Sequence, residues 1–283
     1  MSRRGPGAAA RSLLPLALGV AALAAWWRLL GGPEVLSLLS RADVPTSLLA
    51  FLFLCLSQLF RLLRWHVLLR AVGDVPFGRT FRALYASELL NAVLPVKLGD
   101  AGRAIAIARV PPFSLGSAAA TIVLDRLSGI LARLAVVPLV ALLPLAAARP
   151  LLASAAAFGA ALLGAVLLGA ALRRRPGLLT GPARRLARIL PEPARGPFER
   201  TLSSFASSAV SLGLDSRTAA GAALLSLAAL ALQAGAFWLW FRAAGADLAP
   251  VAALVGTAFL DLLAVLPAPP AGLGVAEWSV TFV

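Results

Sequence analysis

Two apolar segments of this sequence end in a proline and are then followed by charged residues. The segments are Phe81–Pro95 and Val251–Pro267, and the charges that follow them are Lys97, Asp100, Arg103 and Glu277. An ionisable side chain at membrane depth costs at least about 2.5 kcal/mol, so it normally faces a partner or an aqueous cavity. Guanidinium and ammonium groups bind phosphate, whereas carboxylates bind cations or carry protons. These positions are therefore candidates for handling a polar head group.

A third group of ionisable residues lies inside the apolar run Leu115–Ala146. Thr121, Asp125 and Ser128 recur at four and three residues and form one polar stripe of a helix, while Arg126 and Arg133 share another face. Two interpretations stay open, ion pairs that neutralise one another and side chains that bind a head group. Asp100 and Arg103, three residues apart, could likewise pair with each other or bind a head group. The two interpretations are compatible, because a head group can replace an internal partner.

The prolines and nearby glycines predict breaks in both helices. Pro95 and Pro267 lack the N–H that helix continuation needs, and the glycines permit turns and close backbone approach: Gly99, Gly102, Gly272 and Gly274. Unpaired backbone survives in lipid only where protein or a water-filled cavity covers it. Each segment thus reads as a re-entrant hairpin, and a helix restarting after Leu98 would aim its first N–H groups at an anion. The alternative is a plain loop at the membrane surface.

Composition decides the environment. The chain is 60% hydrophobic and 13% charged, with a mean hydropathy of +0.89, whereas soluble domains carry about 25% charged residues. The formal net charge of +14 comes almost entirely from arginine and could mean nucleic acid or membrane, but the apolar runs favour membrane and no nucleic-acid partner. Cys55 is the single cysteine, which excludes an intramolecular disulfide, a structural zinc site and a CxxC redox centre. We expect no cofactor and no metal.

A membrane-spanning helix needs about 20 apolar residues, and five runs approach or exceed that length. They are Ser12–Trp27, Pro45–Leu63, Leu115–Ala146, Leu151–Leu172 and Thr218–Phe241. The first is either an uncleaved helix or a signal peptide with the cleavage-like sequence Ala22-Leu23-Ala24. The sequence therefore predicts an all-α, polytopic membrane protein that forms one transmembrane domain over residues 1–283.

Arginines predict how the chain is oriented, because cytoplasmic loops carry an excess of Arg and Lys. The N-terminus, the stretch after Leu63 and the loop 173–217 are rich in arginine. All three are expected in the cytoplasm, which gives a multi-pass protein of the cytoplasmic membrane with a cytoplasmic N-terminus. Within the loop, Phe198–Leu214 predicts an amphipathic helix on the inner leaflet. Its arginines either bind anionic lipid or only hold the loop inside.

An internal duplication is visible at an offset of 172 residues. That offset places Arg70-Ala71-Val72-Gly73 on Arg242-Ala243-Ala244-Gly245 and Ala92-Val93-Leu94-Pro95 on Ala264-Val265-Leu266-Pro267. Chance similarity among common residues is the rival explanation. The copies lie near 45–109 and 218–283, and three spans between them would insert the copies in opposite directions. Inverted repeats of this kind place transporter binding sites between discontinuous helices at the membrane midplane.

Residues near the end of the second span are expected at the membrane interface. Arg61 and Arg64 are predicted to reach lipid phosphates rather than to bind a substrate. Trp65 is expected in an interfacial aromatic belt, and His66 is expected beside it.

Several of these stretches together resemble a known family. They are Arg64-Trp65, Leu90–Ala104, Asp125-Arg126-Leu127 and Pro267–Glu277, and they are similar to the flippase-like transmembrane domain of lysylphosphatidylglycerol synthases, a family with stand-alone relatives. The similarity runs from about residue 12. Its most specific part is the pattern Asn-x-x-x-Pro-x-x-x-Gly-Asp-x-x-Arg from Asn91 to Arg103.

The chain departs from this family in three places. The family usually has Glu where Asp100 and Asp125 stand, and a Pro-Gly-Gly-rich turn in place of Pro267–Gly272. Members commonly continue for another helix or more, so a chain that ends at Val283 is expected to be truncated.

The resemblance implies movement of a lipid or lipid-linked head group across the membrane, and it does not supply the aminoacyl transfer of the separate soluble domain. The leading hypothesis is a non-enzymatic lipid flippase or transporter. Its candidate substrate-binding residues are Asn91, Pro95, Lys97, Gly99, Asp100, Arg103, Asp125, Arg126, Pro267, Gly272, Gly274 and Glu277. The alternatives are a membrane-embedded transferase for a lipid-linked substrate and a noncatalytic membrane subunit. Membrane lipids are the expected partners, and a homo-oligomer is compatible with each hypothesis.

Overall fold

The computed structural model describes residues 42–93, 98–136 and 192–263, together with residues 28, 40 and 160. Within these ranges the regular structure is entirely α-helical, as the sequence predicts. The helices are α3 (Val44–Arg70), α4 (Phe77–Val93), α5 (Leu98–Ala108), α6 (Leu115–Val136), α9 (Glu192–Leu214), α10 (Ser216–Ala243) and α11 (Pro250–Leu263). The expected span 12–27, the expected turn after Pro267, and the expected span 151–172 except for residue 160 lie outside the described residues.

Two of these helices can cross a membrane. α3 and α10 contain 27 and 28 residues and are apolar along their length. They match the predicted spans 45–63 and 218–241: α3 starts one residue earlier and ends seven residues later, and α10 extends two residues further at each end. α3 exposes large apolar side chains, with Leu48 and Phe51 65% and 59% accessible. An apolar surface of that kind suits lipid rather than water. α3 and α10 are therefore candidate membrane spans.

Both membrane helices start with the same cap. Asp43 accepts a hydrogen bond from the backbone N–H of Thr46 and another from its hydroxyl, and Pro45 occupies the first turn. Asp215 accepts from the backbone N–H and the hydroxyl of Thr218 in the same way. These bonds satisfy N–H groups that the helix itself leaves unpaired. The Thr218 hydroxyl bond, with the backbone bond, lowers the pKa of Asp215. The charged cap is therefore complete above the ordinary carboxyl pKa and is lost as pH falls through the lowered value.

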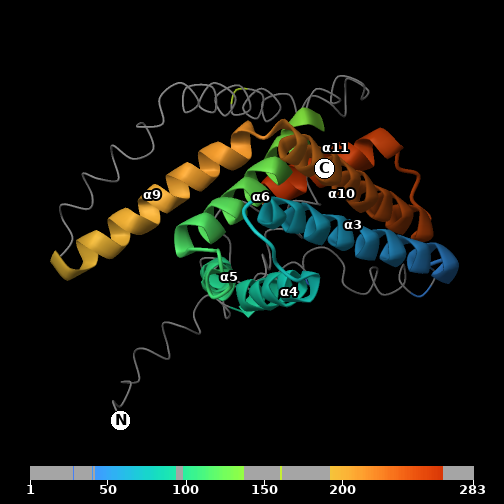
Figure 1. Ribbon diagram of the computed structural model, residues 1–283. Coiled ribbons are helices and arrows are strands. Elements are labelled where there is room, and N and C mark those ends of the chain that lie inside the picture. Colours follow the sequence, from blue (N-terminus) through green and yellow to red (C-terminus); the bar gives the residue numbers. More distant parts are fainter. Residues whose placement is uncertain are drawn as a thin grey trace, which may run out of the picture.

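α3 and α10 pack against each other in opposite directions. The backbone N–H of Asp43, at the start of α3, donates to the carbonyl oxygen of Ala243, at the end of α10, over 2.9 Å. Halfway along both helices, the buried Ser57 hydroxyl donates to the Ala229 carbonyl oxygen over 2.7 Å. Figure 1 shows the two helices side by side, with α6 crossing next to them. This antiparallel pair is the frame on which the other helices pack.

The remaining helices position the polar residues. α4 and α5 pack together beneath α3, and α6 contacts α3, α5, α10 and α11. One apolar core joins α3 to α4, α5 and α6 through Leu62, Trp65, Leu84 and Ile107, among others. A second core joins α6, α10 and α11 around Val136, Leu230 and Phe259. α6 therefore lies between the α4–α5 pair and the α10–α11 pair.

The helix predicted for residues 198–214 is confirmed as part of α9, which starts earlier, at Glu192. It packs along α6, and the two backbones come so close at Gly116 that a Cβ atom there would overlap the carbonyl oxygen of Thr201. Part of the expected polar loop is thus a helix packed on α6, while residues 173–191 lie outside the described residues.

Removing the cap of α3 should destabilise the fold. Asp43→Ala deletes the acceptor for the Thr46 N–H, and we expect the free energy of unfolding to fall by about 1 kcal/mol. Asp43→Ser retains a cap and should recover most of that loss. Thermal unfolding in detergent, followed by circular dichroism, measures both. Equal melting temperatures for the parent and the alanine variant would contradict this account of the helix start.

Candidate functional site

The chain passes from one helix to another at the predicted Asn91–Arg103 pattern. α4 ends at Val93 and α5 begins at Leu98. Asn91 joins the two, because its Oδ1 accepts from the Gly99 N–H over 2.8 Å and its Nδ2 donates to Asp100 Oδ1 over 3.3 Å. The first turn of α5 is thus held by a side chain of α4. Pro95 and Lys97 lie between the two helices, outside the described residues.

Gly99 lets the two helices approach this closely. A Cβ atom at this position would overlap the backbone carbonyl oxygen of Ser87 and lie 2.6 Å from Asn91 Oδ1. Gly102 is different, because a Cβ there would make only an ordinary contact with Leu90, at 3.7 Å. Of the two glycines of this pattern, only Gly99 is required by the contact between the helices.

A buried ionic group, which we call the buried triad, lies between α3, α5 and α6. It consists of Asp125, Arg64 and Arg103. Asp125 Oδ1 accepts from Arg64 Nε over 2.8 Å, and Asp125 Oδ2 accepts from Arg103 Nη2 over 3.1 Å. The three side chains are 6%, 7% and 1% exposed. Buried charges of this kind are tolerable only when they are paired and hydrogen-bonded.

The surroundings of the triad correct two expectations. Arg64 does not reach toward lipid phosphates; it is buried, and its Nη1 also donates to Ser226 on α10 over 3.1 Å. Trp65 is not interfacial but fully buried, with its indole N–H donating to Thr121 and its ring 3.9 Å from the Arg103 guanidinium carbon. The ring and the carboxylate thus hold Arg103 from two sides. His66 is partly buried against Thr80.

A second, more accessible group, the hairpin cluster, lies beside the triad and comprises Arg61, Glu88, Asp100 and Arg126. Arg126 Nη2 lies 3.0 Å from Asp100 Oδ1 and 3.9 Å from Glu88 Oε1, and Arg61 Nη2 lies 3.1 Å from the same Glu88 oxygen. These side chains are 22% to 36% exposed. They remain reachable from outside the protein while they hold one another.

Asp100 and Arg103 do not pair with each other, as their spacing allowed. Asp100 takes Arg126 from α6, and Arg103 takes Asp125 from α6. The pairing therefore crosses between two helices, although each helix carries both an acidic and a basic residue. Sequence spacing shows only partners on the same helix, which is why this arrangement was not predicted.

A third polar group, the α11 cluster, consists of Arg133 on α6, Gln233 on α10 and Asp261 on α11. Arg133 Nε donates to Asp261 Oδ2 over 2.8 Å, and Gln233 Nε2 donates to Asp261 Oδ1 over 3.1 Å. Arg133 and Asp261 are 19% and 24% exposed. Along α6, this group lies about two turns beyond Arg126 of the hairpin cluster.

The charges of the first two groups do not cancel. Four guanidiniums (Arg61, Arg64, Arg103, Arg126) face three carboxylates (Glu88, Asp100, Asp125) across the pairs described. Arg103 Nε is buried and has no hydrogen-bond partner among the described residues. The combined groups thus favour one further negative charge, which a phosphate can supply. In the described part of the chain, no group of three His, Cys, Asp or Glu side chains could hold a metal ion.

Six of the predicted site residues are brought together: Asn91, Gly99, Asp100, Arg103, Asp125 and Arg126. The other six lie outside the described residues: Pro95, Lys97, Pro267, Gly272, Gly274 and Glu277. The prediction missed Arg61, Arg64 and Glu88 as members of the site. Helical spacing could have suggested Arg61 and Arg64, which lie three residues apart and therefore on one face of the span.

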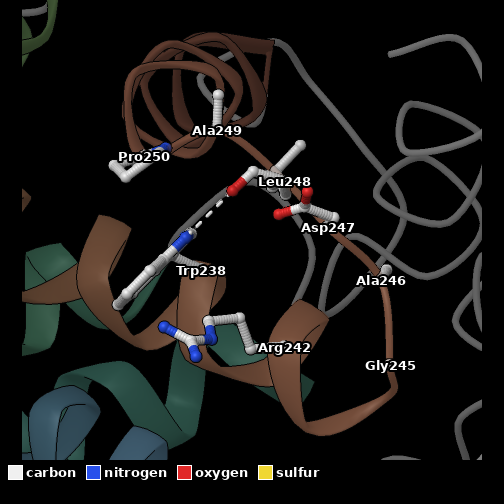
Figure 2. Close-up of a pocket in the computed structure, with 8 residues that line it drawn as sticks. All are labelled: Trp238, Arg242, Gly245, Ala246, Asp247, Leu248, Ala249 and Pro250. Carbon is white, nitrogen blue, oxygen red and sulfur yellow. Dashed lines mark hydrogen bonds between the residues drawn. The ribbon is translucent and has the colours of Figure 1, made fainter.

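A surface pocket of about 450 Å³ lies away from these groups, at the turn between α10 and α11. Figure 2 shows Trp238 and Arg242 on one side of it and the irregular stretch Asp247–Ala249, with Pro250 at the start of α11, on the other. The Trp238 indole N–H donates to the Leu248 carbonyl oxygen over 2.9 Å, and the Arg242 guanidinium carbon lies 5.0 Å from the Trp238 ring. An arginine beside a tryptophan at the end of a span is typical of the membrane interface.

Comparison with known proteins places this geometry in a family. Residues 12–283 match the family described as Lysylphosphatidylglycerol synthase TM region. No curated protein and no solved structure matched the chain. The match covers nearly the whole chain, which includes all three polar groups.

Breaking the buried triad should be costly. Asp125→Asn leaves two buried guanidiniums without their counter-charge, and we expect the free energy of unfolding to fall by about 3 to 5 kcal/mol. The matched control is Asp74→Asn in the exposed Arg70–Asp74 pair, where the loss should stay below about 1 kcal/mol. Thermal unfolding in detergent compares them. Similar losses in both variants would show that the triad does not hold the helices together.

The two glycines of α5 should respond in opposite ways to alanine. Gly99→Ala forces α4 and α5 apart at Ser87, so we expect a loss of about 1 to 3 kcal/mol. Gly102→Ala meets no close atom and should gain up to about 1 kcal/mol, because glycine is a poor helix former. The same unfolding measurement distinguishes the two. The close approach of α4 and α5 is disproved if Gly99→Ala is as stable as Gly102→Ala.

Proposed function

The chain belongs to the family of lysylphosphatidylglycerol synthase transmembrane regions, and from this premise we propose that it moves a lipid or lipid-linked head group across the membrane without changing it chemically. In this proposal the protein is a flippase or transporter and not an enzyme. It spans the cytoplasmic membrane several times, with its N-terminus in the cytoplasm.

The observation that carries the proposal is the partly exposed hairpin cluster beside an apolar, lipid-facing helix. Two guanidiniums and two carboxylates lie 22% to 36% exposed next to α3, whose outer surface is apolar. A polar head group cannot cross hydrocarbon alone, because its charges and hydrogen-bonding groups would be unsatisfied there. Accessible charged side chains within the helical bundle can replace the lost water.

The pairs of the hairpin cluster can exchange partners with a head group. A phosphate can take the place of Asp100 or Glu88 on Arg126, and a cationic group can take the place of Arg126 on Asp100. The excess guanidinium of the neighbouring groups favours the phosphate. The buried triad serves a different purpose, because Arg103 and Asp125 are too enclosed to exchange; they fix α3, α5 and α6 around the cluster.

An inverted repeat is part of the proposal, and helix positions support it. α3 and α10 start 172 residues apart, and so do their caps, Asp43 and Asp215. Ser57 and Ala229, also separated by 172 residues, are in contact halfway along two antiparallel helices. Contact between a residue and its counterpart on antiparallel helices is the arrangement expected close to a two-fold axis. Such an axis in the membrane plane relates the halves of many transporters and supports alternating access.

Lipid movement in vesicles tests the proposal. In proteoliposomes carrying a fluorescent phospholipid that an impermeant reductant quenches only in the outer leaflet, the parent should expose inner lipid to quenching. Asp100→Asn and Arg126→Gln each remove a charge-assisted hydrogen bond, so we expect movement to slow by roughly tenfold.

Asp74→Asn, in an exposed pair outside the cluster, is the control and should move lipid like the parent. If the parent moves lipid and both Asp100→Asn and Arg126→Gln move it at the same rate, the hairpin cluster has no part in the mechanism. Appearance of a new lipid species by mass spectrometry would favour the transferase alternative instead.

A further inference from the structure

We propose that the α11 cluster is a second head-group site, the counterpart of the hairpin cluster, and that it binds a zwitterionic phospholipid head group with its phosphate on Arg133 and its amine on Asp261. This inference rests on the proposed function and adds a second binding position to it. Gln233 completes the site as a neutral hydrogen-bonding side chain.

The same three-part arrangement occurs twice. In the hairpin cluster, Arg61 of α3 contacts Glu88, which lies 27 residues further along, and α6 contributes Arg126. In the α11 cluster, Gln233 of α10 contacts Asp261, which lies 28 residues further along, and α6 contributes Arg133. Arg61 and Gln233 are separated by the same 172 residues as Ser57 and Ala229. Each half of the repeat thus holds one carboxylate between its own first helix and α6.

The two clusters lie on opposite sides of the helix midpoint. Arg61 is four residues beyond Ser57, and Gln233 is four residues beyond Ala229, which is about 6 Å of helix in each case. Because α3 and α10 are antiparallel, these displacements add to about 12 Å along the helix axis. Arg126 and Arg133 are seven residues apart on α6, which gives a similar separation of about 10.5 Å. The α3–α10 pair and α6 therefore give similar separations of the two clusters along their helix axes.

The α11 cluster is accessible and incompletely satisfied. Arg133 and Asp261 are 19% and 24% exposed, unlike the triad, whose Arg103 is 1% exposed. One turn before Asp261 and on the same face of α11, the buried Thr257 hydroxyl has no hydrogen-bond partner among the described residues. A buried hydroxyl without a partner costs free energy unless a ligand or water satisfies it. The site thus offers an accessible guanidinium and carboxylate, with the Gln233 amide and the enclosed Thr257 hydroxyl close to them.

Charge decides which head group fits. The α11 cluster holds one guanidinium and one carboxylate and is neutral, whereas the hairpin cluster with its triad has one excess positive charge. A head group with a phosphate and an ammonium group satisfies both charges of a neutral site. A purely anionic head group would compete with Asp261 for Arg133 and leave the carboxylate without a cation.

Arginines link the two sites along α6. A Cβ atom at Gly129 would lie 3.0 Å from Arg133 Nη1 and 3.1 Å from Arg64 Nη1, so both guanidiniums reach the same place on this helix. Arg64 in turn binds Asp125, the neighbour of Arg126 in the sequence. Arg64 and Arg133 therefore connect the buried triad to the α11 cluster along this helix.

Lipid retention tests this site without depending on transport. The purified full chain is placed in nanodiscs of equal parts phosphatidylethanolamine and phosphatidylglycerol, and native mass spectrometry measures the lipids that stay bound. We expect Asp261→Asn to reduce retained phosphatidylethanolamine by roughly tenfold and phosphatidylglycerol by less than about twofold, because only the amine loses its carboxylate. Equal losses of the two lipids, or no loss, would overturn the inference.

A variant without either charge separates binding from folding. Arg133→Met combined with Asp261→Leu removes both charges and leaves neither one unpaired between α6 and α11. It should melt near the parent temperature and still lose phosphatidylethanolamine. Parent-like retention by this double variant would reduce the cluster to a structural pair. Asp74→Asn serves as the control that retains both lipids.

The two proposals can fail separately. If the parent retains phosphatidylethanolamine through Asp261 but moves no lipid in vesicles, the second site stands and the proposed function fails. If Asp100→Asn stops lipid movement while Asp261→Asn retains both lipids like the parent, the function stands and the second site fails.

Discussion

A carboxylate that must satisfy two guanidiniums away from water is the constraint on which the rest of this structure depends. Asp125 receives Arg64 from α3 and Arg103 from α5, so a single side chain of α6 fixes the relative register of three helices. The apolar contacts around Trp65 and Ile107 permit many small displacements, but the ionic contacts do not, because each lost bond would leave a buried charge unpaired. The ring of Trp65 against Arg103 further restricts that guanidinium.

Exposure, more than charge, separates the structural residues of this interior from those that can meet a ligand. The triad is nearly closed to solvent, while the hairpin and α11 clusters on either side of it are about a fifth to a third open. Rigid ionic contacts in the centre hold the frame, and looser ones beside it can exchange partners. This difference in exposure accounts for how the bundle holds five arginines in an apolar setting: Arg61, Arg64, Arg103, Arg126 and Arg133. Each of them is paired with a carboxylate, and the more exposed pairs lie beside the buried triad.

The sequence was sufficient for features that depend on neighbouring residues. Apolar runs located α3 and α10, and the proline-glycine pattern located the change from α4 to α5, because helix length and helix breaking are local properties. Pairings between helices could not be derived in this way. In the sequence, Arg64 and Trp65 lie near the end of a long apolar run and look like interfacial residues, because nothing there shows that α6 passes beside them. Asp100 pairs with Arg126 and not with Arg103, which is closer in the sequence, because of how α5 lies on α6.

The buried triad also constrains how sequences of this kind can diverge. Loss of Asp125 alone leaves the guanidiniums of Arg64 and Arg103 without a counter-charge, and loss of either arginine alone leaves the Asp125 carboxylate with one partner in place of two. A lineage that abandons the arrangement must therefore pass through a poorly folded intermediate or change three distant codons nearly together. Aspartate and glutamate can be interchanged with less disturbance, since both bring the same charge. The three positions are therefore expected to change together, although 61 residues of chain separate Arg64 from Asp125.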